Sequence, residues 1–445
     1  MNFVKKYVFI CWALSVVTGC APKNHVTRSY ISAELRNKSG FDLANSKQPG
    51  QLELPANIVT DDGINEDEAI AIALWNNAQF QADLASVAIA NADVIDAGIV
   101  SNPLLRYLSP NAGIMASGYI NFAFDFLWMR PRRVSGAITE AERVGESMVQ
   151  KGFGLIRDVQ LSYTDLQLAH DKSIIFAENA RIRAEMTRLS NARLRYGEIS
   201  EFEALTFRAD SATAVDQSIR ANLDTIVLRN RLFSLIGFGP DTTLSIELIK
   251  DTLIAQKISR SEYLDLAFSH QPELQTARLA IEAAGKRLGW EKSRIIGFTA
   301  VLNYEHIPTG DNNKWLPNAF NPGFQMELPL LNRNQGKIAR AKAEMEQASF
   351  QYVSLQQRIA LDVIEAFNRY EEVYKAYEAW NSAVLPNLEE ALHLVQLSYE
   401  RGDISYLPVL EALRQLVNGK LRKAEIEAEL RRSVSQLNYS IGNKN

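Results

Sequence analysis

The sequence predicts a mainly α-helical protein built by internal duplication, with one amphipathic β-hairpin in each half. Three observations lead to this fold class: a motif that occurs twice, stretches of alternating apolar and polar residues, and a long helical segment after each of them. Residues 196–200 (YGEIS) are similar to residues 401–405 (RGDIS), and Ile236-Gly237 recurs as Ile441-Gly442. The spacing is 205 residues in both cases. This period is far too long for a solenoid, so it indicates a duplicated half.

The first parts of the two halves also align, but at a different spacing. Residues 73–81 correspond to residues 267–275 at an offset of 194, whereas Ala137 corresponds to Ala341 at an offset of 204. Roughly ten extra residues therefore lie in the second half, and the polar stretch 308–314 is where we expect them, because length differences collect in surface loops.

The repeats divide the chain into segments. We expect a first repeat at 61–240, a linker at 241–260 and a second repeat at 261–445. Residues 20–60 are polar with scattered Pro and Gly, which indicates an extended arm before the first repeat.

The N-terminus has the pattern of a secretory signal. Lys5 and Lys6 precede an apolar run that is too short to span a bilayer as a helix. The run ends at Thr18-Gly19-Cys20, which resembles a lipoprotein box, so residues 1–19 would be removed and Cys20 would carry the lipid, including palmitate. Ala21 rather than Asp follows, as in proteins sorted to the outer membrane. The alternative is an ordinary signal with an accidental cysteine.

Composition argues against several functional classes. The formal charge changes from −4 to −6 when Lys5 and Lys6 are removed, which is too mild a charge to indicate a nucleic-acid partner. The five histidines are scattered, and there is no Cys/His cluster, nucleophile motif or glycine-rich phosphate loop. We therefore expect no enzyme activity, no catalytic or metal site and no cofactor.

Long helices account for most of the chain. Apolar residues at helical spacing predict helices at residues 67–100, 134–196, 200–236, 261–294, 336–400 and 405–441. Pro386 would kink the fifth of them. A helix of sixty residues is about 90 Å long, and such a helix must lie along partners as in a coiled coil.

Two hairpins are expected, at about 103–130 and 296–330. Apolar residues alternate with polar ones from Ile120 to Trp128, from Ile296 to Tyr304 and again from Phe324 to Leu328. About ten residues of such alternation with aromatics are typical of a membrane-spanning strand. A half-buried hairpin of a soluble protein is the alternative, and the large aromatic residues favour the membrane.

Two hairpins supply only four strands, whereas the smallest transmembrane barrels have about eight. An open sheet edge cannot face lipid, because its unpaired N–H and C=O groups would each cost several kcal/mol. If these strands span a membrane, several chains must therefore contribute to one barrel.

Three motifs resemble the outer membrane factor family, the TolC-like outer membrane efflux proteins. They are residues 264–274, which contain LDLA and QPEL, residues 328–336 (LPLLNRNQG) and residues 401–412 (RGDISYLPVLEA). The resemblance covers nearly all of residues 60–442. The NRNQG form is similar to the heavy-metal/RND efflux branch, whereas residues 128–133 (WMRPRR) depart from the glycine and lysine run that usually follows the strand.

The resemblance implies a homotrimer. Three chains would supply four strands each to a twelve-stranded outer-membrane barrel, and their helices would continue as a hollow coiled-coil barrel through the periplasm. A periplasmic adaptor protein and an inner-membrane pump would be the partners. The channel would passively export small molecules or metal ions.

The resemblance also places the two helical turns at the periplasmic mouth. Gly197, Glu203, Gly402, Asp403 and Glu411 are then candidates for the aperture or for adaptor contact. Local roles compete with this assignment. The glycines would supply the helix-ending conformation, Glu203 would complete a capping box, and Glu411 would be a solvated surface residue.

Other functions fit parts of the sequence. A duct for type I protein secretion fits the same architecture. A non-conducting coiled-coil envelope lipoprotein would not need amphipathic strands, and a periplasmic adaptor would carry a soluble β-rich domain instead. The sequence leaves open whether a metal, drug, siderophore or polypeptide is exported.

Overall fold

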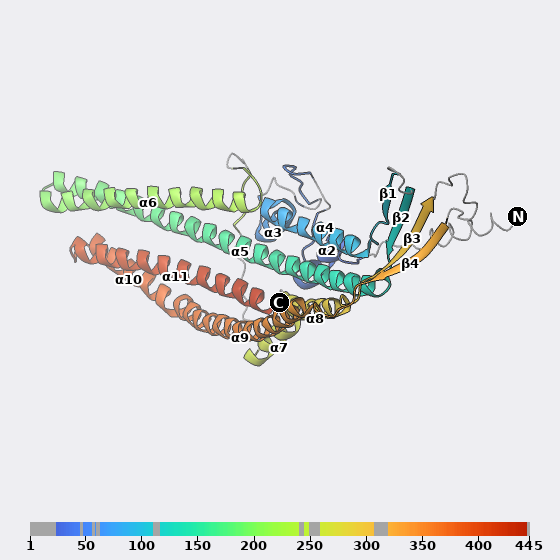
Figure 1. The fold of residues 1–445 in the computed structure, drawn as a ribbon. Helices are drawn as coiled ribbons and strands as arrows, with labels where there is room; N and C mark the ends of the chain where they lie inside the picture. Colours follow the sequence, from blue (N-terminus) through green and yellow to red (C-terminus); the bar gives the residue numbers. More distant parts are fainter. Residues whose placement is uncertain are drawn as a thin grey trace, which may run out of the picture. The chain divides into compact units, whose positions relative to one another are not determined.

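The structure, a computed structural model, describes residues 24–44, 48–55, 58, 63–109, 116–239, 244–248, 259–306 and 319–442. The signal, Cys20 and the insertion expected at 308–314 lie outside the described residues. The order of elements is the same in the two halves: two helices, a β-hairpin, a long helix and a returning helix (Figure 1). The predicted duplication is therefore also visible in the fold.

The contacts divide the chain into two compact units. The first contains residues up to Ile31, Leu84–Met148 and Pro272–Leu355, and the second contains Ser32–Asp83, Val149–Gln271 and the chain from Gln356 onward. Each unit takes residues from both predicted repeats, because the long helices run from one unit into the other.

The first unit contains a four-stranded antiparallel sheet in the order β1-β2-β3-β4 (Figure 1). Its strands are β1 (Leu104–Leu108), β2 (Ala116–Ala123), β3 (Phe298–His306) and β4 (Ala319–Met326). The central pair, β2 and β3, joins the hairpins of the two halves, with Ile120 opposite Leu302. Strands β1 and β4 are the two edges.

The exit from β2 differs from the sequence prediction. Alternation predicts a strand as far as Trp128, but only two residues separate Ala123 from the start of α5 (Phe126–Arg195). The Phe124 N–H still donates to the Phe298 carbonyl at 2.8 Å, and the Asp125 carbonyl then accepts from the Met129 N–H at 3.0 Å. Hydrogen bonding within α5 therefore replaces hydrogen bonding between the strands from one residue to the next.

Two predicted single helices are in fact pairs. Residues 67–100 form α3 (Glu66–Asn76) and α4 (Ala78–Gly98), and residues 261–294 form α7 (Arg260–His270) and α8 (Pro272–Ser293). The breaks fall at Asn77 and Gln271, with ψ of 114° and 116°. The Asn77 side chain caps α4 by accepting from the Phe80 N–H at 2.9 Å, and Pro272 disfavours helical geometry in the residue before it.

The predicted extended arm contains a helix, α2 (Arg28–Ser39). Ile31 and Leu35, one helical turn apart, are fully buried. Burial of this apolar pair stabilises a helix whose other residues are mostly polar.

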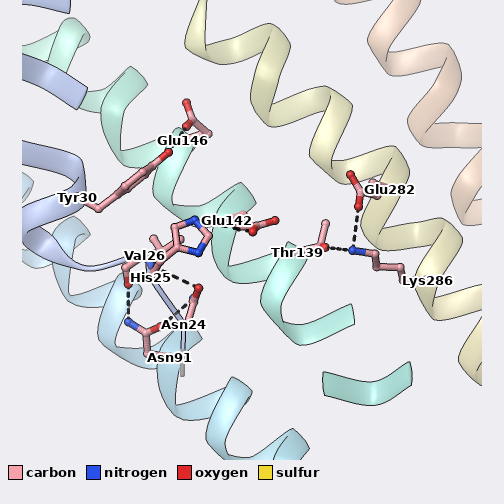
Figure 2. A network of polar contacts seen from close by, with 10 residues as sticks. All are labelled: Asn24, His25, Val26, Tyr30, Asn91, Thr139, Glu142, Glu146, Glu282 and Lys286. Atoms are coloured by element: carbon pink, nitrogen blue, oxygen red, sulfur yellow. Dashed lines mark hydrogen bonds and ion pairs between the residues drawn. The ribbon is translucent and has the colours of Figure 1, made fainter. Parts of the chain in front are cut away.

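Residues 24–30 lie against α4 and α5 within the first unit (Figure 2). Asn24 donates to the Asn91 side chain at 2.9 Å, and Asn91 donates to the Val26 carbonyl at 2.8 Å. The Tyr30 hydroxyl donates to Glu146 at 3.1 Å. A Cβ on Gly145 would lie 2.6 Å from Val26 Cγ1, so Val26 fills the notch that this glycine leaves. Residues 24–30 are therefore anchored to α4 and α5.

The second unit contains two helical hairpins. One is formed by the end of α5 and α6 (Glu201–Leu235), and the other by α10 (Leu385–Glu400) and α11 (Tyr406–Ile441) (Figure 1). Long helix α9 (Gln335–Ala379) precedes a π-helical turn, Trp380–Val384. There the Leu385 N–H donates to the Trp380 carbonyl, five residues back. The wider turn directly precedes Pro386, which has no N–H to donate, so the irregularity predicted at Pro386 is a π-turn.

None of the helices in the described ranges is long and apolar enough to cross a bilayer.

We predict that Gly237→Ala destabilises the protein. Gly237 ends α6 with φ of +92°, and a Cβ there would lie 2.7 Å from the Asn76 carbonyl oxygen. The strained backbone and the clash together should cost about 2–3 kcal/mol. Thermal denaturation followed by circular dichroism should show a lower midpoint. Gly239→Ala is the matched control, because a Cβ at Gly239 meets nothing within 4 Å. Equal midpoints for the two variants would contradict the prediction.

Candidate functional site

One face of the sheet is apolar on all four strands. Residues directly opposite each other in an antiparallel ladder point to the same face, so the register gives the composition of each face. Leu105 pairs with Ile120, Ile120 with Leu302, and Leu302 with Pro322. The described side chains on this face, called the apolar face, are Leu105, Tyr107, Gly118, Ile120, Phe122, Phe298, Ala300, Leu302, Tyr304, Pro322, Phe324 and Met326. None of them carries a charge.

Within the described residues, much of the apolar face is exposed. Phe324 is 69% exposed, and Leu105, Tyr107, Ile120 and Leu302 are exposed as well. An apolar surface of this extent on one side of a sheet indicates contact with a membrane or another protein.

The opposite face is mostly polar. Residue by residue it carries Leu104, Arg106, Leu108, Ser117, Tyr119, Asn121, Ala123, Thr299, Val301, Asn303, Glu305, Asn321, Gly323 and Gln325. A cavity of about 610 Å³ lies at the base of this face, and Asn121, Thr299 and Gln325 line it together with Arg130 and Glu327. Alternation of one apolar and one polar face is the pattern of a strand between lipid and water.

The two edges of the sheet lack partner strands within the described chain. β1 pairs only with β2, and β4 pairs only with β3. All five residues of β1 are exposed. Both edges could therefore pair with strands of other copies.

The two hairpin tips have the same backbone geometry. Gly197 and Gly402 have φ of +74° and +83°. The Gly197 N–H donates to the Leu194 carbonyl and the Glu198 N–H to the Arg193 carbonyl, both at 3.0 Å. In the second hairpin, the Gly402 N–H donates to Tyr399 and the Asp403 N–H to Ser398, again at 3.0 Å. These are the paired bonds of a Schellman motif. The predicted helix-ending role of both glycines is confirmed.

Asp403 is exposed beside Gly402. Its backbone N–H closes the turn, and its side chain is accessible to a partner.

The capping box predicted at Glu203 is only half present. The Glu203 N–H donates to Ser200 Oγ at 3.2 Å, so Ser200 caps α6. The return bond from the Glu203 carboxylate is not part of this cap, whereas complete boxes occur at Asn65 with Glu68 and at Ser259 with Glu262. Burial raises the pKa of Tyr399 most, the charge of Arg193 opposes this rise, and the charge of Glu203 adds to it.

Glu411 is solvated and paired within its own helix. Its carboxylate accepts from Gln415 Nε2 at 3.0 Å and lies 2.9 Å from Arg414. The hydrogen bond from Gln415, followed by that from Arg414, lowers the pKa of Glu411, so the carboxylate is ionised at neutral pH. Glu411 and Arg414 together present a carboxylate and a guanidinium on the surface of α11.

An aromatic contact joins the two hairpins, and sequence reasoning missed it. Phe207 on α6 stacks on Tyr406 at the start of α11, with ring centroids 3.6 Å apart. Both are buried, together with Val409. No sequence pattern connects these residues, because they occupy unrelated positions in the two repeats.

Charged groups surround this stack. The Arg193 guanidinium lies 4.6 Å from the Tyr399 ring centroid, and Arg183 lies 3.7 Å from Asp210. Burial, followed by the charge of Asp210, raises the pKa of Tyr406 to about 12. The Tyr406 phenol is therefore neutral at physiological pH, as its buried position requires.

Large apolar side chains are exposed near the turns. Phe202 is 81% exposed, and Tyr196 and Leu407 are also largely exposed. They flank the two glycine turns and give the tips a surface suited to protein contact.

No group of three or more His, Cys, Asp or Glu side chains in the described residues is placed to hold a metal ion.

We predict that Phe207→Ala loosens the contact between the hairpins. Loss of a buried phenylalanine costs about 3–5 kcal/mol, so amides in the first turns of α11 should exchange hydrogen faster. Phe202→Ala removes the same side chain from an exposed position, and hydrogen exchange in the first turns of α11 should stay unchanged. If the Phe207 variant exchanged no faster than the Phe202 variant, the stack would not hold the hairpins together.

Comparison with known proteins agrees with this geometry. Residues 263–443 match the outer membrane efflux protein family. The cobalt-zinc-cadmium resistance protein CzcC of Cupriavidus metallidurans is 19% identical over 380 residues, which are 84% of this chain and 89% of that protein.

Solved structures share the fold. The outer membrane protein VceC of Vibrio cholerae has a TM-score of 0.71 at 18% identity, and the alignment covers 85% of this chain and 96% of VceC. CusC, which forms a transmembrane channel, also has a TM-score of 0.71 at 18% identity, with 90% and 99% covered. The second repeat thus matches the outer membrane efflux protein family, and the chain shares the fold of the solved outer-membrane channels VceC and CusC.

Proposed function

We propose that three copies of this chain form one export channel in the outer membrane, with a closed barrel of about twelve strands. The observation that carries the proposal is the four-stranded sheet with one apolar face, one polar face and two unpaired edges. Pairing β4 of one copy with β1 of the next would satisfy both edges and turn the apolar face toward lipid.

The choice of three copies rather than two rests on the family resemblance. Two chains would supply about eight strands, which is also enough for a small barrel. An eight-stranded barrel is filled by its own side chains, whereas a larger one leaves an aqueous channel. An export function therefore favours the larger assembly.

The hairpin tips would form the periplasmic end of the channel. The exposed Tyr196, Phe202 and Leu407 near Gly197 and Gly402 support contact with a periplasmic adaptor protein, which would connect the channel to an inner-membrane pump. Substrates would then cross passively through the channel, while the pump supplies the energy.

Metal ions or other small molecules would be the exported substrates. The name of the relative CzcC, a cobalt-zinc-cadmium resistance protein, supports metal ions. Growth of a strain without this chain on cobalt, zinc or cadmium salts, compared with growth on hydrophobic drugs, distinguishes the two substrate classes.

A lipid on Cys20 would anchor the same assembly. Cys20 lies outside the described residues, but Asn24, four positions later, is held by Asn91 on α4. Four residues span at most about 14 Å. The lipid would therefore be attached close to the unit that contains the sheet.

We predict that the purified protein is a trimer that conducts ions. Native mass spectrometry in mild detergent should give the mass of three chains, and the same preparation should form channels in planar bilayers. A stable folded monomer, or a dimer without conductance, would contradict the proposed channel.

We predict that Glu411→Gln lowers the cation preference of the channel. Three copies of Arg414 would lose their carboxylate partners at the mouth, where charges are poorly screened. The cation-to-anion permeability ratio from single-channel recordings should fall about twofold or more.

Glu178→Gln is the matched control for this variant. Glu178 pairs with Arg181 at 2.8 Å with the same three-residue spacing and similar exposure as Glu411 with Arg414. The control should leave the ratio unchanged. Equal ratios for both variants and the parent would remove Glu411 from the mouth.

We predict that the mature chain begins at a lipidated Cys20. Intact-mass measurement of the N-terminal peptide should give the mass of the acylated cysteine. An unmodified Cys20, or cleavage at another bond, would show an ordinary signal sequence instead.

A further inference from the structure

The second hairpin leaves the sheet through a longer connection than the first. Eight residues, called the strand-exit loop (327–334), separate the end of β4 at Met326 from the start of α9 at Gln335. Only two residues separate β2 from α5. The strand-exit loop contains three exposed leucines, Leu328, Leu330 and Leu331, and Leu331 is 93% exposed.

Leu328 continues the apolar face beyond the sheet. Phe324 and Met326 lie on that face, and Leu328 follows at the same spacing of two residues. The ladder extends one residue past β4, because the Glu327 N–H donates to the Gly297 carbonyl at 3.3 Å. Leu328 therefore leaves the sheet on the apolar side, and the exposed Leu330 and Leu331 follow it in the loop.

The loop is held in one conformation by polar contacts at its end. Asn334 has φ of 58° and donates to both the carbonyl and the carboxylate of Glu291 at 2.8 Å. Glu291 is buried. Asn332 accepts from the Asn334 N–H at 3.0 Å, and Gln335 accepts from the Arg333 N–H at 2.7 Å. The exposed leucines thus belong to a loop whose end is stabilised by hydrogen bonds.

Two cations adjoin the leucines. Arg333 in the loop and Lys337 in the first turn of α9 are exposed. Neither forms an ion pair with a carboxylate within the ranges that the structure describes. Exposed leucines beside unpaired cations match the chemistry of a phospholipid, which has acyl chains next to a phosphate.

We propose that the strand-exit loop inserts into the periplasmic leaflet of the outer membrane. Leu328, Leu330 and Leu331 lie among the acyl chains, and Arg333 and Lys337 bind phospholipid phosphates. The inference rests on the proposed function, because it takes the apolar face as the lipid-facing surface. Continuity with that face and the two cations favour lipid over a second copy of the chain.

The decisive measurement locates a fluorophore on the loop. Leu331→Cys, labelled with an environment-sensitive dye, is reconstituted into nanodiscs as the full-length channel. Quenching by phospholipids with an acyl-chain nitroxide is compared with quenching by aqueous iodide. The sequence contains only Cys11 and Cys20, and the parent chain taken through the same labelling gives the background.

Two further labelled variants separate the loop from the channel as a whole. Phe324→Cys reports on the apolar face, and Leu407→Cys reports on an exposed hairpin tip. We expect nitroxide lipids to quench the labels at 331 and 324, and iodide to quench the label at 407.

Each of the other outcomes contradicts either the inference about the loop or the proposed membrane function. If lipid quenches the label at 324 but iodide quenches the label at 331, the loop is in water and the inference fails while the channel stands. If neither quencher reaches the label at 331, a second copy covers the loop and the inference also fails. If lipid does not quench the label at 324, the proposed membrane function itself fails.

The phosphate contact has its own test. Arg333→Gln with Lys337→Gln should lower the phosphatidylglycerol retained by the channel, measured by native mass spectrometry from mixed nanodiscs, about fivefold for each cation removed. Arg181→Gln with Lys375→Gln removes the same charge from exposed positions on α5 and α9 and should retain lipid like the parent. Equal retention in both double variants would refute the phosphate contact.

Discussion

Backbone hydrogen bonding at the two edges of the sheet constrains everything else in this molecule. Within the described residues, β1 and β4 each have one paired side and one open side, and open N–H and C=O groups cannot remain unpaired in lipid. The four strands that the structure describes are too few to close a barrel, so they cannot pair both edges by themselves. The same chain presents an apolar face that water disfavours. In the proposed trimer both costs would disappear together, because the edges of neighbouring copies would pair, so assembly and membrane insertion would be one requirement.

The sequence predicted those elements whose signal is local. Alternation from Ile296 to Tyr304 predicted β3 and the side on which each residue lies, because a period of two is independent of the partner strand. The same rule failed beyond Ala123, where Phe124, Phe126 and Trp128 keep the spacing of a strand while the backbone turns into α5. Apolar spacing alone does not reveal where hydrogen bonding changes from between strands to within a helix.

Other features depend on contacts that a sequence does not show. Helix α2 was missed because Ile31 and Leu35 are stabilised by burial against other segments, while the remaining residues favour solvent. At the tips, the glycine turns were predictable from left-handed geometry, but the Phe207–Tyr406 stack was not. Glu203 had the sequence spacing of a capping box, yet only the Ser200 half formed, whereas Glu262 at the same spacing completes its box with Ser259.

The two repeats share the backbone geometry of their turns but differ in the side chains beside them. Gly197 and Gly402 close the same turn with the same pair of bonds, so three chains would present about six nearly equivalent turns. Glu411 has Thr206 at the matching position of the first repeat, and its carboxylate would therefore occur only three times. A partner that recognises the turns would meet a sixfold surface, whereas an ion at the mouth would meet a threefold ring of charge. Divergence between the repeats can therefore alter selectivity without disturbing the assembly, since the turns depend on glycine and on backbone bonds alone.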